Sequence, residues 1–347
     1  MNAPIQSADL MPQTVEFKLN DQRVQAYEGE SILKAAQRHG VDIPHLCYKD
    51  GLRADGNCRA CVVEIKGERS LAPSCCRTAT AGLEVLVSDR AIKSQKMVLE
   101  MLLSDMPDVG YKWNDASYLG SSLAAATEDT PGSSCGEPKS SPGASPIAAV
   151  GAARNSFSSE LAAGQHGELS DWASRLNVSV RPALRALRRE QPACDVSHPA
   201  MAVNLDACIQ CNRCVRACRE EQVNDVIGYA HRGAHSQIVF DLNDAMGNSS
   251  CVACGECVQA CPTGALMPKT QIGSQVVDKQ VDSVCPFCGV GCLLTYNVKD
   301  NKIVSVDGRD GPANHNRLCV KGRFGFDYIH SPQRLTVPLI QIGRAHV

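Results

Sequence analysis

The sequence predicts an α+β fold divided into several small modules, each stabilised by bound metal. Three observations lead to this prediction. Many of the 19 cysteines are separated by only two or three residues, as metal ligands often are. Aromatic residues make up 4% of the 347-residue chain, so bound metal is expected to supply stability that a large aromatic core would otherwise give. Strand-like and helix-like patterns alternate in the first part of the chain.

The first module is predicted to begin with a hairpin. Residues 15–19 alternate apolar and polar side chains as a half-buried strand does. Asn20 and Asp21 can form the turn into a second strand at residues 24–27. Ser31 is a candidate N-cap for the helix that follows.

Gly40 is placed to end that helix. Three more strands are expected, within residues 61–66, 70–74 and 82–88. Two strands, one helix and three strands in this order suit a small sheet wrapped around one helix. We therefore predict a β-grasp domain over residues 14–92.

A helix is predicted to leave the first module. Residues 91–105 carry apolar side chains at near-helical spacing, within a helical connection expected at 93–118. Met97 and Met101 are expected to fill gaps in the core, because methionine adapts to irregular spaces.

The middle of the chain is predicted to connect modules. Residues 119–168 are rich in Ala, Ser, Gly and Pro and have little to bury, so a flexible low-complexity insert is expected there. A second helical connection is expected at 169–200, with the basic run 181–190 as the solvated face of a helix. The net charge is −2 and other basic residues are scattered, so no nucleic-acid partner is predicted.

The chain is predicted to be cytoplasmic. Its first residues have no basic start, no apolar core of signal length and no paired arginines. No uncharged apolar run approaches the length of a membrane span, so no span is predicted. In a reducing compartment, closely spaced cysteines are more often metal ligands or catalysts than disulfides.

The first group of cysteines can hold a two-iron cluster. Four thiolates from two separated loops would bind two to each iron, with backbone N–H groups hydrogen-bonded to the sulfurs. The adjacent Cys76 leaves the fourth position open. Zinc is the alternative, but zinc prefers two tight pairs to one widely separated cysteine. The candidate ligands are Cys47, Cys58, Cys61 and Cys75.

The second group consists of two identical runs, the second of which ends in Cys-Pro. Three cysteines at two-residue gaps can wrap one four-iron cluster, and in two-cluster ferredoxins the fourth cysteine of each run binds the other cluster. The crossing ties residues 201–270 into one domain. One predicted set is Cys208, Cys211, Cys214 and Cys261, and the other is Cys251, Cys254, Cys257 and Cys218.

The hairpin predicted between the two runs, at residues 228–241, carries His231 and His235. These are expected to be surface residues, because no cluster in this domain lacks a ligand.

The third group also provides four thiols, and four thiolates make a closed site. Zinc or a [4Fe-4S] cluster would fit such a site, whereas nucleophilic catalysis would not. A redox pair formed by the first two cysteines would leave the other two unexplained. The candidate ligands are Cys285, Cys288, Cys292 and Cys319.

Two stretches resemble domains of known redox proteins. The segments "GNCRAC" and "APSC" resemble the N-terminal [2Fe-2S] domain shared by the large iron-sulfur subunit of complex I, iron-only hydrogenases and NAD-linked formate dehydrogenases. Because "APSC" is similar to the Pro-x-Cys that ends this motif, Cys75 is preferred to Cys76. The plant-type ferredoxin spacing is not met.

The second stretch, "CPFCGVGC" with "LCVKGRFG", resembles the small [4Fe-4S] domain of molybdenum and tungsten bis-pterin oxidoreductases. The resemblance implies such a domain at 278–336 and the truncated start of the pterin-binding domains at 337–347. In that family the lysine two residues after the last cysteine lies between cluster and pterin. Lys321 is therefore the expected cofactor contact and electron relay.

The order of motifs resembles the N-terminal third of the alpha subunit of cytoplasmic NAD-dependent formate dehydrogenase. Relatives often carry a further cluster on the motif His-x3-Cys-x2-Cys-x5-Cys, but residues 102–113 contain neither histidine nor cysteine. The complex I subunit and the hydrogenases characteristically have that cluster, so formate dehydrogenase is favoured.

The resemblance implies one [2Fe-2S] cluster and three [4Fe-4S] clusters in this chain, and a molybdenum- or tungsten-bis-molybdopterin guanine dinucleotide in the full-length protein. The catalytic metal ligand would lie beyond Val347, so no catalytic residue is expected within the chain, which we take to be incomplete. Electrons from formate would pass through the clusters to flavin- and NAD-binding iron-sulfur partner subunits, because no dinucleotide-binding fingerprint follows a strand. The alternatives are a complex I-like or hydrogenase subunit, and a standalone multi-cluster electron carrier.

Overall fold

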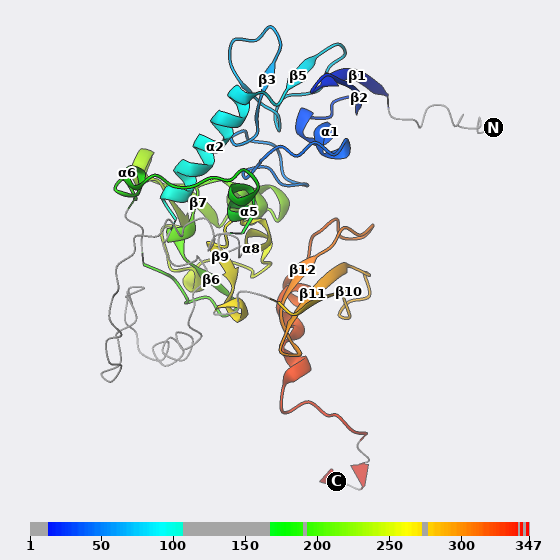
Figure 1. The fold of residues 1–347 in the computed structure, drawn as a ribbon. Helices are drawn as coiled ribbons and strands as arrows, with labels where there is room; N and C mark the ends of the chain where they lie inside the picture. The colour runs from blue at the N-terminus through cyan, green and yellow to red at the C-terminus, as the bar shows by residue number, and fades with distance from the viewer. Residues whose placement is uncertain are drawn as a thin grey trace, which may run out of the picture.

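Three small α+β modules follow one another along the chain. The structure is a computed structural model and describes residues 13–106, 167–189, 193–272, 277–338, 341–342 and 345–346. Figure 1 shows the first module in blue and cyan, the second in green and yellow, and the third in orange. The predicted α+β class is confirmed. Residues 119–166 of the predicted insert lie outside the described residues.

The first module is a five-stranded mixed sheet. Its strands are ordered β2-β1-β5-β3-β4, and β1 and β5 run parallel. The turn between β1 and β2 places Asn20 and Asp21 at positive φ, which two-residue hairpin turns require. The predicted hairpin is therefore confirmed. The strands are β1 (Thr14–Leu19), β2 (Gln22–Tyr27), β3 (Val62–Ile65), β4 (Ala72–Pro73) and β5 (Glu84–Leu86).

Helix α1 (Ile32–Arg38) is covered by this sheet, which makes the predicted β-grasp arrangement. Its apolar side chains are buried in one core with those of β1, β3 and β5. The Ser31 hydroxyl accepts a hydrogen bond from the backbone N–H of Lys34 at 3.3 Å, so Ser31 is the N-cap. Gly40 follows the helix at φ +73°.

Helix α2 (Asp89–Ser104) joins the first module to the second. Gln95, Leu99 and Leu103 are spaced four residues apart, so they share one face, and this face is buried against β3 and α5. Met97 and Met101 lie on the opposite face, with 49% and 61% of their surface exposed. The prediction that these methionines fill the core was therefore wrong.

The second module has short elements around two cysteine-bearing loops. Helix α5 contacts α2, and the strand pairs β6/β9 and β7/β8 are antiparallel, which confirms the predicted hairpin between the cysteine runs. A π-helical turn (Ala217–Glu221) directly extends α7. The remaining elements are α5 (Glu168–Arg175), α6 (Pro182–Arg185), β6 (Met201–Val203), α7 (Arg213–Arg216), β7 (Ile227–Ala230), β8 (Gln237–Phe240), α8 (Glu256–Ala260) and β9 (Leu266–Pro268).

The basic run in the second connection is mostly exposed, as predicted, but within its described residues 181–189 the α-helix covers Pro182–Arg185 alone. Arg181 donates to Glu100 at 2.7 and 3.0 Å, and Arg189 pairs with Asp105 just after α2. The run therefore attaches the connection to α2, because buried or half-buried carboxylates there need cationic partners.

The third module is an antiparallel sheet ordered β10-β11-β12, followed by short helical turns. One side of the sheet packs against α9, and Leu294, Val306 and Leu318 form a small buried core. The elements are β10 (Lys279–Val284), β11 (Leu293–Lys299), β12 (Lys302–Gly308) and α9 (Val320–Phe324), with a short pair β13 (Gln341–Ile342) and β14 (Ala345–His346) further along.

Within the described ranges, no helix combines the length and the apolar sequence needed to cross a bilayer.

The shared face of α2 makes a testable contribution to stability. Leu103→Ala should lower the free energy of unfolding by about 2–5 kcal/mol, because the side chain is buried between two modules. Met101→Ala, on the exposed face of the same helix, should lower it by less than about 0.5 kcal/mol. Urea unfolding followed by circular dichroism measures both, and equal losses would contradict this packing.

Candidate metal centres

The first group of cysteines converges below the sheet of the first module. The Cys47 thiol is within hydrogen-bonding reach of the thiols of Cys58 and Cys75, and Cys61 reaches Cys75. These sulfur contacts, from Cys58 first and then Cys75, lower the pKa of Cys47, and the contact with Cys47 raises the pKa of Cys58. The backbone N–H of Cys47 donates to the Cys58 sulfur at 3.4 Å. These contacts therefore favour the thiolate, the form that binds metal, at Cys47.

Cys75 and Cys76 occupy different positions. Cys75 is buried with the other thiols, whereas Cys76 is exposed and has its sulfur 3.6 Å from that of Cys75. The preceding Ser74 is fixed by its hydroxyl, which donates to the Cys61 carbonyl at 2.7 Å. The structure thus groups Cys75, and not Cys76, with Cys47 and Cys61.

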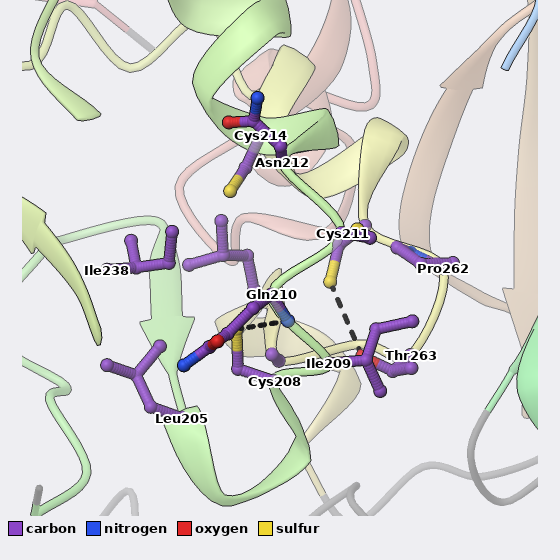
Figure 2. Close-up of a pocket in the computed structure, with 13 residues that line it drawn as sticks. Leu205, Cys208, Ile209, Gln210, Cys211, Asn212, Cys214, Ile238, Pro262 and Thr263 are labelled. Carbon is purple, nitrogen blue, oxygen red and sulfur yellow. Dashed lines mark hydrogen bonds between the residues drawn. The ribbon is translucent and has the colours of Figure 1, made fainter. Parts of the chain in front are cut away.

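In the second module, the first run and the last cysteine of the second run line one cavity. Its empty volume is about 360 Å³, counting the part that is open to solvent. Figure 2 shows the sulfur atoms of Cys208 and Cys214 directed into this space from opposite sides. The four cysteines that line it are Cys208, Cys211, Cys214 and Cys261.

Burial controls the ionisation of these thiols. It raises the pKa of Cys208 to about 11 and that of Cys211 to about 12, and it raises the pKa of Cys214 well above its ordinary value. A buried thiolate is costly without a compensating charge, so these positions favour either neutral thiols or metal-bound thiolates. Binding of a metal cluster here would release protons.

The second run repeats the local geometry of the first. The backbone N–H of Gln210 donates to the Cys208 sulfur at 3.4 Å, and the N–H of Ala253 donates to the Cys251 sulfur at the same distance. Gln210 and Ala253 both have positive φ, as do the residues two positions later, Asn212 and Gly255. The third cysteine of each run lies in a short helix, α7 or α8.

The two runs are crossed in space. Charges on Cys251, Cys254 and Cys218 all act on the pKa of Cys257, which burial raises well above its ordinary value. Cys218, from the π-helical turn after the first run, therefore lies with the second run, and Cys261 lies with the first. The structure thus brings together the two crossed sets that the sequence predicts, and their ligand roles stay predictions.

The third group lies at the start of the third module. Burial raises the pKa of Cys292, and charges on Cys285, Cys288 and Cys319 raise it further, so the four thiols are neighbours. The Cys285 N–H donates to the Cys292 carbonyl at 2.8 Å and closes the loop between them. Cys288 and Cys319 are exposed.

Lys321 lies in the first turn of α9, two residues after Cys319, and its side chain is exposed. Its predicted relay and cofactor-contact roles stay predictions.

Four sets of cysteines fit iron-sulfur clusters by their donor chemistry: the first group, the two crossed sets of the second group, and the third group. Each set offers four thiols, which are the usual ligands of such clusters. Within the part of the chain that the structure describes, no three or more His, Cys, Asp or Glu side chains stand close enough to hold a single metal ion. The thiols of Cys208, Cys211, Cys214 and Cys261, which surround a cavity, suit a cluster of several atoms better than one zinc ion. His231 and His235 are exposed, as predicted.

Three buried arginines connect the modules, and the sequence patterns did not predict this role. Arg213 donates to Glu168 at 2.7 and 2.8 Å and also to the Tyr48 carbonyl in the first module. Arg323 donates to Glu256 at 2.6 Å and to the Cys254 carbonyl at 3.1 Å, which joins the third module to the second.

The third of these arginines, Arg216, donates to the Cys47 carbonyl at 2.5 Å. Arg213 and Arg216 are three residues apart within the cysteine run. This spacing is the feature of the sequence from which their shared role could have been predicted. A cation placed there can lie beside a buried cluster, which carries negative charge.

Three protein-family models match the chain. They are a 2Fe-2S iron-sulfur cluster binding domain at residues 12–89, a 4Fe-4S dicluster domain at 207–265 and the molybdopterin oxidoreductase Fe4S4 domain at 278–331. The chain carries the iron-sulfur domains of the molybdopterin oxidoreductase N-terminal region. The three predicted domain types are therefore confirmed, and together they form an electron-transfer iron-sulfur module.

Curated relatives with different activities are similar to this chain. An NADH-quinone oxidoreductase subunit of Rhizobium meliloti is 28% identical over 94% of this chain and 33% of its own length. The putative formate dehydrogenase YrhE of Bacillus subtilis is 25% identical over 96% of this chain and 34% of its own. The NADPH-Fe(3+) oxidoreductase subunit alpha of Geobacter sulfurreducens is 27% identical over 95% and 33%. The chain thus spans about a third of the length of these relatives.

A solved structure has the same fold. The crystal structure of an NAD+-reducing [NiFe]-hydrogenase in the H2-reduced state matches 76% of this chain and 92% of its own chain, with a TM-score of 0.54 and 23% identity. The similarity extends over more than one module.

The positions of Cys75 and Cys76 give a direct test of the first group. Cys75→Ala should abolish the visible absorbance and the electron paramagnetic resonance (EPR) signal of a [2Fe-2S] cluster, because the variant lacks one of four thiolates. Cys76→Ala, the matched control, should keep both signals, since that thiol is exposed and lies outside the group. Loss of the signals in Cys76→Ala alone would reverse the assignment.

The crossed pairing can be tested by whether iron losses add. Cys208→Ala and Cys261→Ala should each remove one four-iron cluster, and the double variant should lose no more iron than either single variant. Cys208→Ala combined with Cys218→Ala should lose about twice as much, because the two residues belong to different sets. Iron analysis of protein purified without oxygen measures this, and the opposite pattern would show uncrossed runs.

Proposed function

We propose that this chain is the electron-transfer portion of the alpha subunit of a molybdenum- or tungsten-dependent, NAD-linked formate dehydrogenase. In this function, electrons from formate, oxidised at a pterin-bound metal, pass through the four clusters to flavin- and NAD-binding partner subunits. The observation that carries the proposal is the succession of three iron-sulfur domains, the last of which is the molybdopterin oxidoreductase Fe4S4 domain.

The likeness to a putative formate dehydrogenase over 96% of the chain supports the substrate. The absence of histidine and cysteine from residues 102–113 also supports it, because the motif of a further histidine-ligated cluster has no counterpart there.

The residues of this chain would hold the clusters and shield them. Bound clusters supply one-electron redox chemistry at potentials set by net charge, hydrogen bonds to sulfur and exposure. The N–H groups of Cys47, Gln210 and Ala253 donate to cysteine sulfurs and would stabilise the bound thiolates. Apolar neighbours such as Leu205, Ile209 and Ile238 keep water from the thiols of the first [4Fe-4S] set.

At the other end of the module, the exposed thiols of Cys288 and Cys319 and the exposed Lys321 are available to the catalytic cofactor. We infer that Lys321 contacts the pterin of the full-length protein and serves as the electron relay. A long, flexible cation beside a cluster can pair with the negative charge of a pterin nucleotide.

We place the protein in the cytoplasm. A reducing compartment keeps thiols free, and closely spaced cysteines there are more often metal ligands than disulfides. The electron acceptor NAD is also a soluble cofactor.

A second candidate function is the large iron-sulfur subunit of a complex I-like enzyme or of a hydrogenase. The identity of 28% with the NADH-quinone oxidoreductase subunit of Rhizobium meliloti favours it, as does the shared fold with the hydrogenase chain. The two functions differ in the electron donor, so the donor decides between them.

Formate should reduce the clusters of the native complex. The complex, purified without oxygen through a tag on this chain, should contain iron, acid-labile sulfide and either molybdenum or tungsten. Added formate should bleach its visible absorbance and then reduce NAD+. Reduction by hydrogen or NADH with no response to formate would contradict the proposal and support the second candidate.

The control for this experiment is Cys285→Ala in the complete complex. Formate should no longer reduce the [2Fe-2S] cluster of this variant, whereas dithionite should still reduce it, because only the entry to the chain of clusters is interrupted. Zinc without sulfide in the wild-type protein would contradict both functions.

A further inference from the structure

We propose that Arg216 is a positioning residue that joins two neighbouring cluster sites, one in the first module and one in the second. We propose that it also raises the reduction potential of both clusters. The two sites are the Cys47 group and the set formed by Cys208, Cys211, Cys214 and Cys261. The inference rests on the proposed function, because it requires clusters at these thiols.

The guanidinium of Arg216 contacts both sites at once. Its Nη2 donates to the Cys47 carbonyl at 2.5 Å and lies 3.5 Å from the Cys211 carbonyl. Its Nη1 donates to the Arg53 carbonyl, and its Nε donates to the Asn212 carbonyl at 3.3 Å. One planar group therefore binds the loops that carry ligands of two different clusters. The rigid fork of arginine suits this multiple contact, whereas lysine offers a single point charge.

The same contacts make a hydrogen-bonded route between the sites. The route runs from the Cys47 carbonyl through one guanidinium nitrogen to the Cys211 carbonyl. Asn57 and Asn212 support the junction from outside, since Asn57 donates to the Gln210 carbonyl at 2.8 Å and Asn212 to Asp55 at 2.9 Å. The loops are thus joined by polar contacts around Arg216, in addition to the apolar cluster that they share.

The charge of Arg216 is less compensated than that of its two counterparts. Its side chain is 2% exposed, and among the described residues the carboxylate that pairs with it, Asp55, is 3.9 Å away and 23% exposed. Arg213 and Arg323 instead have carboxylates at 2.7 and 2.6 Å. A buried charge with a distant partner acts strongly on its surroundings, because little water screens it.

This charge has a definite effect on reduction. Reduction adds one negative charge to a cluster, so a nearby cation stabilises the reduced form more than the oxidised form. The potential of a cluster depends on local charge in this way. Loss of the cation should therefore lower the potentials of both clusters, and loss of the Asp55 carboxylate should raise them.

The test is a redox titration of the anaerobically purified chain, monitored by EPR. Arg216→Gln should shift the reduction equilibria of the [2Fe-2S] cluster and of the neighbouring [4Fe-4S] cluster at least tenfold toward the oxidised form, which equals about 59 mV for a one-electron couple. The cluster held by Cys285, in the third module, should not shift. Arg216→Lys should keep both potentials close to those of the wild type, because it keeps the charge.

Arg219→Gln is the matched control. Arg219 lies three residues further along, is 56% exposed and pairs with Asp225 at 2.6 Å, so its loss should leave every potential unchanged. Asp55→Asn gives a second, independent reading if Arg216→Gln does not fold. It should shift both equilibria toward the reduced form.

Unchanged potentials in Arg216→Gln or in Asp55→Asn, with clusters present, would overturn the inference while leaving the proposed function intact. Equal shifts in Arg216→Gln and Arg219→Gln would also overturn it, since they would reflect a general change of surface charge. Wild-type protein without iron and sulfide would instead reject the proposed function.

Discussion

The structure depends on how buried thiols are held in groups without a large apolar core. Thiolates are costly inside a protein unless a metal or a hydrogen-bond donor compensates their charge. Burial raises the pKa of Cys208 and Cys211 to about 11 and about 12, so the second module favours neutral or metal-bound sulfur. Several of these thiols belong to the buried core of the second module, so bound metal and folding are expected to be coupled here.

The second module shows how one local design is used twice. Each run wraps its first three cysteines around a site with residues at positive φ, such as Gln210 in one and Ala253 in the other. Position 255 requires glycine, because a side-chain carbon there would collide with the side chain of Arg323. The exchange of Cys218 and Cys261 between the runs makes each site depend on both halves of the module.

Buried arginines, together with apolar packing, connect the thiol groups of neighbouring modules. Arg216 contacts the first and second modules, and Arg323 contacts the second and third. Both donate to the backbone carbonyls of candidate ligand cysteines, so the geometry of the junction and the charge near the clusters are set by the same side chains. Apolar packing adds a second connection through α2, where Leu99 and Leu103 meet the second module. Electron transfer requires fixed distances between centres, and these junctions provide them.

The sequence by itself determined the module types and the thiol groups, because turn residues, strand alternation and cysteine spacing are local properties of the chain. Asn20 and Asp21 predicted the first hairpin, Ser31 predicted the start of α1, and the repeated cysteine runs predicted crossed ligand sets. The tertiary structure decided which face of α2 is buried, so Met97 and Met101 are exposed. It also decided that Cys75 and not Cys76 joins the first group, and that Arg216 bridges two sites. These outcomes depend on contacts between segments up to 169 residues apart, and no local pattern in the chain records which distant carbonyl or side chain a residue will meet.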